Sequence, residues 1–559
     1  MNVSSLETPR WSPLHLKVPR TDRSLLCVPP LEEAIPGAEA NARLLNTDTV
    51  NVQGRPLSYM RQWSREACLR LAQEYTEQLL DGVSLRDGAS QDLAERRLFV
   101  SGHQPSLYHP GVWVKNFAVD HMARAAGGIG LNLVVDNDIL SSTSLRVPTG
   151  TRDELDVVRV SFDAPRPMQP WEDAEVIDRE QFRSFAERVA QTMGMNQSSL
   201  LLDDLWRDAI AESEKSSRLV DCLTTARHRQ ERRWGLQNLE LPISRMCESE
   251  PFLWFASHLL AHLPRFAECH NTVLEEYREL NHVRSRSHPV PALDSRDGWS
   301  EAPFWVWRRG EHVRRAVYAR QQDHTLTLSD GTDEFARLPL TPEMDACCAV
   351  EELKKLPARG IRLRTRALTT TLFARLCLSD LFVHGIGGAK YDEMTDQIIA
   401  RFFGLTPPSF VTMSATLYLP LAKPYDVDVE DRRRLEHELR DIDFNADRHG
   451  LGPKADSLIA EKCELIAAQK GAQTTGLTRR ERRLRTPANR ERFQQLTALS
   501  EKLAALAGEQ RARLQQQLAD VDQKLAVNQI LTDREFSLAL YPPEVIRGFY
   551  ESALDVSAS

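Results

Sequence analysis

The stretch 98-LFVSGHQPSLYHPGVWVKN-116 decides which fold we expect. It reads as a short apolar strand that runs into a loop with two histidines, a glutamine and two prolines, and a helix is expected from Gly111. A glycine turn at 127–128 and the apolar run 131-LNLVVD-136 follow. A strand, a helix and a second strand within about 40 residues predict a βαβ unit, and therefore a parallel sheet.

A second stretch, 381-LFVHGIGGAKYDE-393, begins with almost the same five residues and also breaks into glycines before an expected helix at 390–403. Another helix is expected at 366–379, and a strand at 410–419. In open parallel sheets, ligands bind beyond the carboxyl ends of the strands, and a helix N-terminus attracts phosphate or carboxylate groups. We therefore expect the two loops to line one cleft.

The composition is that of a soluble globular protein with several structural units. The chain has 559 residues, of which 42% are apolar and 27% are charged, and a length of this order predicts roughly two to four units. A net charge of −8 argues against a dominant nucleic-acid surface. The nine cysteines form no C-x-x-C pair, and no signal sequence or membrane-spanning run is evident. These features predict a cytoplasmic location.

The pattern changes along the chain predict an α/β fold in five segments. Residues 1–195 would hold an N-terminal arm and the first part of a Rossmann-like parallel-sheet core, and residues 356–425 its second part. Between them, residues 196–355 read as an inserted α+β module. A helical coiled coil is expected at 426–530, and residues 531–559 are expected to return to the core.

Leucine spacing predicts one long amphipathic helix within the coiled-coil segment. The apolar positions are Leu496, Leu499, Leu503, Leu506, Leu514, Leu518, Val521 and Leu525. This spacing is typical of a coiled-coil seam, and helices at 430–443 and 454–471 are possible antiparallel partners. A helical hairpin within one chain and a homodimer between chains both stay open. The cluster 479-RRERRLR-485 is interpreted as a solvated face or a helix start.

The first loop and helix supply six candidate ligand-binding residues: Gly102, His103, Gln104, His109, Lys115 and Asn116. Histidine can transfer protons or bind phosphate, and the amide side chains can hold a sugar. A glycine lets the backbone approach a ligand without a Cβ in the way. The alternative for the two histidines is that they cap or brace the loop.

Two carboxylates, Asp136 and Asp138, follow the strand after the first helix. They can orient a hydroxyl-rich ligand, bind Mg²⁺ or position an amine, and simple turn chemistry is the alternative. The next residues, 141-SSTSLR-146, match a nucleotidylyltransferase motif, but they stand in the wrong order for that family and without its His-x-Gly-His.

The distal candidates are Arg364, Arg366, His384, Gly385, Gly387, Gly388, Tyr391 and Ser414. Arginines at a strand end suit bidentate capture of a carboxylate or phosphate, although a solvated basic face explains them equally. His258 and His262 have zinc-like spacing but no obvious third ligand, and a core role is the alternative. The proline-rich run 282–293 would either reach over the cleft or link two domains.

Together these motifs resemble the bacillithiol synthase family, whose members add cysteine to glucosaminyl-malate. The resemblance is clearest at 98–140 and 362–418, where an arginine-led helix, a strand into a glycine loop, a helix to Phe-Gly and a double proline follow one another. It implies a Rossmann-like nucleotidyltransferase-type core, an inserted module, and a coiled coil that pairs two subunits. It also implies a cleft for cysteine and an amino-sugar malate conjugate.

The chain departs from the family pattern at its chemical groups. The run 135-VDND-138 lacks the family's histidine and glutamate, Pro105 replaces a glutamine, and 389-AK-390 displaces an acid of the second loop. On the resemblance, His103 is the expected acid/base, Gln104 and Asp136 would orient the substrate, and Arg364 with the 387–388 glycines would hold an anion.

The expected partners are a small-molecule substrate and a second copy of the chain, with no nucleic acid, membrane or metal. A nucleotide cofactor is left open. Two alternatives stand beside the bacillithiol-synthase-like ligase. One is a nucleotidyltransferase-like enzyme that acts on another metabolite, and the other is a catalytically silent coiled-coil scaffold.

Overall fold

The computed structural model describes residues 11, 16–84, 90–285, 287–471 and 487–555. The chain divides into two compact units. Unit 1 comprises the described parts of 1–149, 157–419 and 534–559, and unit 2 comprises those of 150–156 and 420–533.

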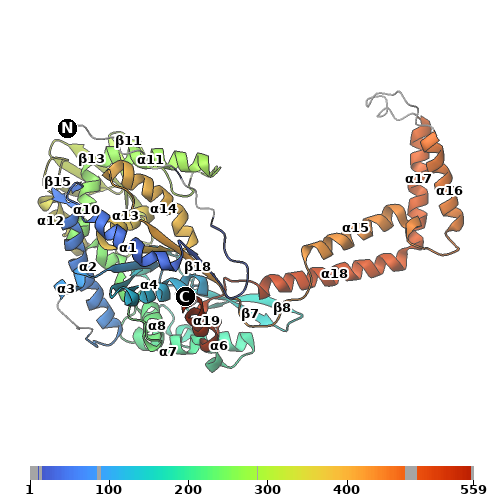
Figure 1. Ribbon diagram of the computed structural model, residues 1–559, viewed down its shortest axis with the longest axis horizontal. Coiled ribbons are helices and arrows are strands. Elements are labelled where there is room, and N and C mark those ends of the chain that lie inside the picture. Colours follow the sequence, from blue (N-terminus) through green and yellow to red (C-terminus); the bar gives the residue numbers. More distant parts are fainter. Residues whose placement is uncertain (1–10, 12–15, 85–89, 286, 472–486, 556–559) are drawn as a thin grey trace. The chain divides into compact units, whose positions relative to one another are not determined.

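A central sheet of mainly parallel strands organises unit 1 and confirms the predicted mixed α/β class (Figure 1). Its strands, in spatial order, are β1 (Ser24–Val28), β18 (Phe410–Thr416), β17 (Leu381–His384), β4 (Leu98–His103), β5 (Ile129–Val134) and β10 (Leu239–Pro242). Only β1 runs antiparallel to its neighbour in this sheet. The predicted βαβ unit is β4, α4 (Pro110–Ala125) and β5.

A buried ion cluster fixes the start of the two look-alike strands. Asp380 directly precedes β17, and its Oδ2 accepts a hydrogen bond of 2.8 Å from the backbone N–H of Leu98, the first residue of β4. The same carboxylate pairs with Arg61 at 2.8 Å and Arg65 at 3.0 Å, both from α2 (Leu57–Leu79). One aspartate therefore ties the beginnings of β4 and β17 to each other and to a covering helix.

A second, antiparallel sheet carries β11 (Ser295–Arg296), β12 (Trp299–Arg308), β13 (Arg315–Gln322), β14 (Thr325–Ser329), β15 (Glu334–Pro339) and β16 (Ile361–Thr365). The expected segment 196–355 does not stand apart from the core, because β10 lies inside it and pairs with β5 of the central sheet. Conversely, β16 belongs to the expected second core part and pairs with β12. The run 239-LELP-242 is too short to signal a strand by its pattern.

The remaining helices of unit 1 are α1 (Leu31–Leu45), α3 (Ser90–Glu95), α5 (Arg179–Arg183), α6 (Phe185–Met193), α7 (Leu201–Ser213), α8 (Leu219–Arg233), α9 (Ile243–Cys247), α10 (Glu250–Ala261), α11 (Leu263–Leu280), α12 (Cys347–Leu353), α13 (Ala367–Phe373), α14 (Ile386–Ile398) and α19 (Pro543–Asp555). Short strands are β2 (Asn51–Val52), β3 (Arg55–Pro56), β6 (Ile139–Leu140), β7 (Ser144–Gly150), β8 (Leu155–Ser161) and β9 (Gln169–Pro170). The helix expected at 390–403 is α14, and it begins at Ile386, closer to β17 than the sequence pattern indicates.

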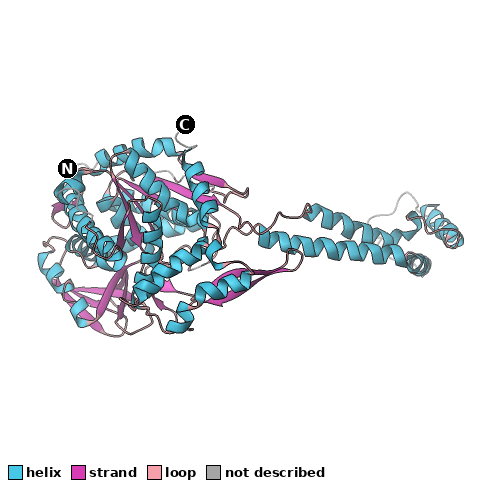
Figure 2. Ribbon diagram, turned by 90° about the horizontal axis from the view of Figure 1, so that it is seen from below, coloured by secondary structure: helices cyan, strands magenta, loops and turns pink. Residues whose placement is uncertain are grey.

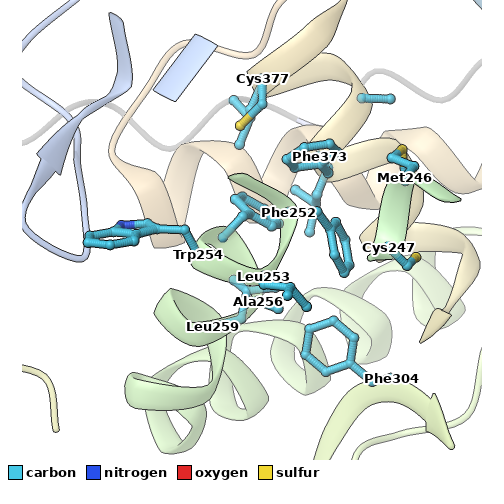
Figure 3. Close-up of a cluster of buried hydrophobic side chains, with 14 of the residues drawn as sticks. Met246, Cys247, Phe252, Leu253, Trp254, Ala256, Leu259, Phe304, Phe373 and Cys377 are labelled. Carbon is cyan, nitrogen blue, oxygen red and sulfur yellow. The ribbon is translucent and has the colours of Figure 1, made fainter. Parts of the chain in front are cut away.

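Aromatic side chains join the two sheets through a common core. Phe252 of α10 lies between Phe373 of α13 and Phe304 of β12, with ring centroids 5.2 and 6.5 Å away (Figure 3). All three side chains are fully buried. This core holds the antiparallel sheet and α13 in fixed positions beside the central sheet.

Unit 2 is built from α15 (Val429–Asn445), α16 (Asp456–Gly471), α17 (Pro487–Leu506) and α18 (Gly508–Leu531), shown as helices in Figure 2. Helix α15 packs on α17 and α18, and α16 packs on α17. The expected single long helix is wrong, because α17 ends at Leu506 and α18 begins at Gly508. Ala507 between them is buried against Ile442 and Leu503, and glycine is a weak helix former.

The arginine cluster 479–485 lies outside the described residues. Among the helices that are described, none is both long and apolar enough to cross a membrane.

Candidate functional site

The two look-alike strands are direct neighbours in the sheet. Strands β4 and β17 pair in parallel, with Ser101 opposite Val383. Chain order runs outward from β4 through β5 to β10 on one side, and from β17 to β18 on the other. The order therefore reverses between β4 and β17, and this is where ligands bind in open parallel sheets.

A cavity of about 320 Å³ lies at the carboxyl edge of this sheet. We call it the edge cavity. It is lined by Gln104, Val135, Asn137, Asp138, Phe266, His270, Val290, Pro291, Leu293, Pro303, Trp305, Arg314 and residues 365–370. The proline-rich run after α11 thus contributes to its wall, as one of the two sequence interpretations expects.

A second cavity, of about 340 Å³, shares Gln104 and Asp138 with the first. We call it the serine cavity, after Ser106, Ser141, Ser142 and Ser144 in its wall. Gln104 Nε2 donates a hydrogen bond of 2.8 Å to Asp138 Oδ2, and Arg314 Nη2 lies 3.2 Å from Asp138 Oδ1. Gln104 and Asp138 therefore form a wall common to both cavities, and Arg314 lines the edge cavity alone.

Arginine side chains and an indole ring give the edge cavity its charge pattern. The guanidinium of Arg366 lies 4.1 Å from the ring centre of Trp305, and that of Arg314 lies 5.2 Å from it. Arg366 also pairs with Glu301 at 2.6 Å. Of the charged residues that line the cavity, Arg314 and Arg366 are positive and Asp138 is negative, so the cavity offers both signs of charge.

His103 is half-buried beside the edge cavity but is not one of its lining residues. Its ring packs edge-on against Tyr108, 4.8 Å away. Burial, and then the nearby positive charge of Lys115, lower the pKa of His103 to about 3. The imidazole is therefore neutral at pH 7, which makes it a poor proton donor there.

Asp136 and Lys115 have structural roles, because each bonds a backbone group at the end of a strand or helix. The buried Asp136 accepts a hydrogen bond of 2.9 Å from the backbone N–H of Ser244 and another from its hydroxyl, and so caps α9; burial raises its pKa. Lys115 donates 2.9 Å to the carbonyl of Gly102, and burial lowers its pKa to about 8. Asn116 donates 2.7 Å to Glu231. Asn116 thus joins α4 to α8, and none of these three side chains lines the edge cavity.

Gly102 and His109 have local structural roles. A Cβ at Gly102 would lie 3.1 Å from the backbone oxygen of Leu133, so the glycine permits close packing of β4 on β5. His109 caps α4, because its Nδ1 accepts a hydrogen bond of 3.1 Å from the N–H of Gly111. This is the capping role that the sequence leaves open.

At the second loop, His384 is held by an ion pair, and the space beside two glycines is unfilled. His384 Nε2 lies 2.7 Å from Asp392, which also pairs with Arg375 at 2.8 Å. A Cβ at Gly388 would come within 2.9 Å of the His384 ring. At Gly385 and Gly387 it would meet nothing within 4 Å.

The other distal candidates are spread over the unit. Arg364 is buried and held by Glu172 and Glu248, each at 2.8 Å, in a separate groove of about 420 Å³. Tyr391 packs against His288, with ring centres 5.9 Å apart. The hydroxyl of Ser414 accepts 2.9 Å from Arg534. Of all sequence-predicted candidates, Gln104, Asp138 and Arg366 are the ones that line the edge cavity.

Within the described residues, one trio could hold a metal: the buried His228, Glu231 and Glu240. Arg227 pairs with both carboxylates, at 2.9 and 2.6 Å, and supplies the positive charge that a metal ion would bring. His258 Nδ1 accepts the backbone N–H of Gln53 at 3.2 Å, which fits the core interpretation of that histidine.

Sequence reasoning missed Asn137, Glu301, Trp305 and Arg314. The last three come from a segment that reads as a separate module, and its alternating pattern predicts strands without saying which sheet edge they face. Asn137 stands between two predicted aspartates and could have been found as part of that turn. Comparisons with protein-family models and with curated proteins find no match to the chain.

Proposed function

We propose that this chain is an enzyme of the bacillithiol-synthase type, which joins an amino acid such as cysteine to an amino-sugar conjugate such as glucosaminyl-malate. The observation that carries the proposal is the edge cavity beyond the carboxyl ends of β4 and β5, since β4 is the strand that pairs with β17 where the strand order reverses. Two cavities with the Gln104–Asp138 wall in common suit a reaction that brings two small molecules together.

The proposed reaction forms an amide bond between the sugar amine and the amino-acid carboxyl group and releases water. Asp138 and Gln104 would position the attacking amine, since a carboxylate accepts a hydrogen bond from it and withdraws a proton as the bond forms. Arg366 would bind a carboxylate of either reactant. A nucleotide remains a candidate co-reactant, because the open Gly385 and Gly387 begin α14.

The proposal extends to fold and assembly. A Rossmann-like core is supported by the strand order β10-β5-β4-β17-β18, with its reversal beside β4. A homodimer through a coiled coil of unit 2 is supported by Phe444 and Phe493, whose side chains are 70% and 55% exposed. Light scattering of the full chain should give twice 63.5 kDa, and a monomer mass at micromolar concentration would reject the dimer.

The test is a product assay by mass spectrometry. Purified protein is incubated with L-cysteine and glucosaminyl-malate, with and without ATP or CTP, and the ligated thiol is measured. Product should form, and Asp138→Asn should reduce its rate by about 100-fold or more, as the loss of a positioned acid/base group does. Because Asp138 is 37% exposed, the variant should keep its melting temperature.

Other outcomes of the product assay would favour one of the two alternative functions. Pyrophosphate release and stabilisation by nucleotide alone would favour a nucleotidyltransferase-like enzyme on another metabolite. No product and no thermal stabilisation by any of these compounds would reject the enzyme and favour the scaffold.

A further inference from the structure

Two adjacent cysteines, Cys347 and Cys348, lie on the surface at the start of α12. Their sulfur atoms are 3.8 Å apart, and both residues are exposed. Cysteine is among the residue types that are most often buried, and exposed thiols are usually avoided at protein surfaces. The buried cysteines of this chain are Cys68, Cys222, Cys247 and Cys377. Core packing explains those four, but it does not explain the exposed pair.

The two sulfur atoms converge although their residues are neighbours in the chain. On a helix, side chains one position apart point in different directions and do not face each other. Cys347 is the first residue of α12, and its backbone N–H donates a hydrogen bond of 2.7 Å to Oδ1 of the exposed Asp345. Hydrogen bonding of its thiol to Asp345, and then to Cys348, raises the pKa of Cys347. A carboxylate and two thiols thus gather at one place on the surface.

The backbone between the two cysteines disfavours a disulfide. Their peptide bond is trans, and it holds neighbouring Cα atoms about 3.8 Å apart. The Cα atoms of a disulfide usually lie about 4.4–6.8 Å apart. A bond between the two sulfurs would therefore distort the first turn of α12, and the pair is better suited to a ligand that both sulfurs share.

The spacing of the sulfurs suits a metal ion. Two sulfur ligands of a tetrahedral zinc site, each about 2.3 Å from the ion, lie about 3.8 Å from each other. The sulfurs of Cys347 and Cys348 have this separation before any ion binds. Thiolate sulfur is a soft ligand that favours ions such as Zn²⁺ over Mg²⁺ or Ca²⁺. Because both residues are exposed, an ion can reach them directly from solvent.

We propose that Cys347 and Cys348 form a surface binding site for a soft divalent cation of the zinc class, with both sulfurs as ligands. Each thiol loses its proton to solvent as its bond to the ion forms, so binding releases about two protons. Asp345 offers a carboxylate oxygen, and water completes the ligand set. The site is separate from the buried histidine–glutamate trio of α8 and β10, where Arg227 already supplies the positive charge.

The test is a titration of the full, reduced chain with Cd²⁺, whose bonds to thiolate absorb in the ultraviolet. One ion should bind per chain, and Zn²⁺ should displace it. Cys347→Ser and Cys348→Ser should each weaken binding at least about 10-fold, because each removes a sulfur ligand and even the loss of an outer partner costs about 10- to 100-fold. Both variants should keep their melting temperature, because the two side chains are exposed.

The matched control is Cys463→Ser. Cys463 of α16 is also exposed, but its neighbours in the chain are Lys462 and Glu464. Its variant should leave the Cd²⁺ affinity unchanged. Alkylation gives a second measurement: Zn²⁺ should protect Cys347 and Cys348 from iodoacetamide and leave Cys463 reactive, as peptide mass spectrometry can show.

The inference would be overturned by Cd²⁺ binding that survives in both serine variants, by equal weakening in Cys463→Ser, or by the absence of thiolate absorption with the unmodified chain. Resistance of Cys347 and Cys348 to alkylation without metal, relieved by a reductant, would show that they form a disulfide and would overturn it as well. The inference does not depend on the proposed function, because neither cysteine lines the edge cavity or the serine cavity.

Discussion

The loop after β4 and the loop after β17 leave the same sheet edge from nearly identical strands, yet they do different work. The first sends Gln104 into the wall between two cavities. The second leads directly into α14, and His384 before it is buried against Asp392, which also pairs with Arg375. Two strands of similar sequence thus precede a cavity wall in one place and a buried ion pair in the other. The side chains after the strand, and what they can pair with, decide which.

The largest expected effect on stability comes from replacing Asp380, the carboxylate that ties the beginnings of β4 and β17 together. Asp380→Ala would leave Arg61 and Arg65 buried without their carboxylate and the N–H of Leu98 without its acceptor. The free energy of unfolding should fall by about 3–5 kcal/mol, as it does when one partner of a buried ion pair is removed. Urea denaturation measures this change.

The exposed pair Arg547–Glu551 supplies the control for that variant. Glu551→Ala should change the free energy of unfolding by no more than about 1 kcal/mol. A loss below about 1 kcal/mol for Asp380→Ala would show that the cluster does not hold the two strands together.

An intermediate effect on stability is expected at Asp392, in the segment after β17, and it should differ from the effect of Asp138→Asn on turnover. Asp392→Asn removes the charge that faces His384 and Arg375, and it should cost about 1–3 kcal/mol of stability. Turnover per folded molecule should stay within about threefold, in contrast to Asp138→Asn. A variant that is stable but inactive would place the second loop in the reaction and erase the contrast.

The same variant has a pH signature. Burial opposes it, but the charges of His384 and Arg375 hold the pKa of Asp392 below its ordinary value. The unfolded chain therefore binds this proton first as pH falls, so the stabilisation by Asp392 is complete above about pH 5 and declines below it. The stability difference between the unmodified chain and Asp392→Asn should shrink from pH 5 toward pH 3; a constant difference would contradict this.

The smallest expected effect on turnover at pH 7 concerns His103. Its folded pKa of about 3 lies below the unfolded value near 6.5, so the unfolded chain binds one more proton between these values and stability falls as pH drops through that window. His103→Gln should flatten this decline in urea titrations and leave most turnover intact at pH 7. Complete loss of turnover in a folded His103→Gln variant would restore the histidine as the acid/base.

Local sequence patterns predicted the parallel core but not the roles of the individual side chains at its edge. The apolar runs of β4, β5, β17 and β18 and the glycine breaks after two of them were enough to place a sheet edge with loops. They could not reveal that Asp136 caps α9 or that Arg364 is held by two carboxylates, because those partners are distant in sequence. Likewise, Trp305 and Arg314 reach the edge through an antiparallel strand pair whose docking depends on aromatic packing around Phe252.

Hydrogen exchange on the full chain, with and without cysteine plus glucosaminyl-malate, tests the central claim most directly. If the carboxyl edge beside β4 is the ligand site, backbone amides of 104–109, 137–145 and 366–370 should exchange more slowly when both compounds are present. The groove around Arg364, followed through residues 309–312, should not change. Protection confined to 309–312, or none in either region, would contradict the account.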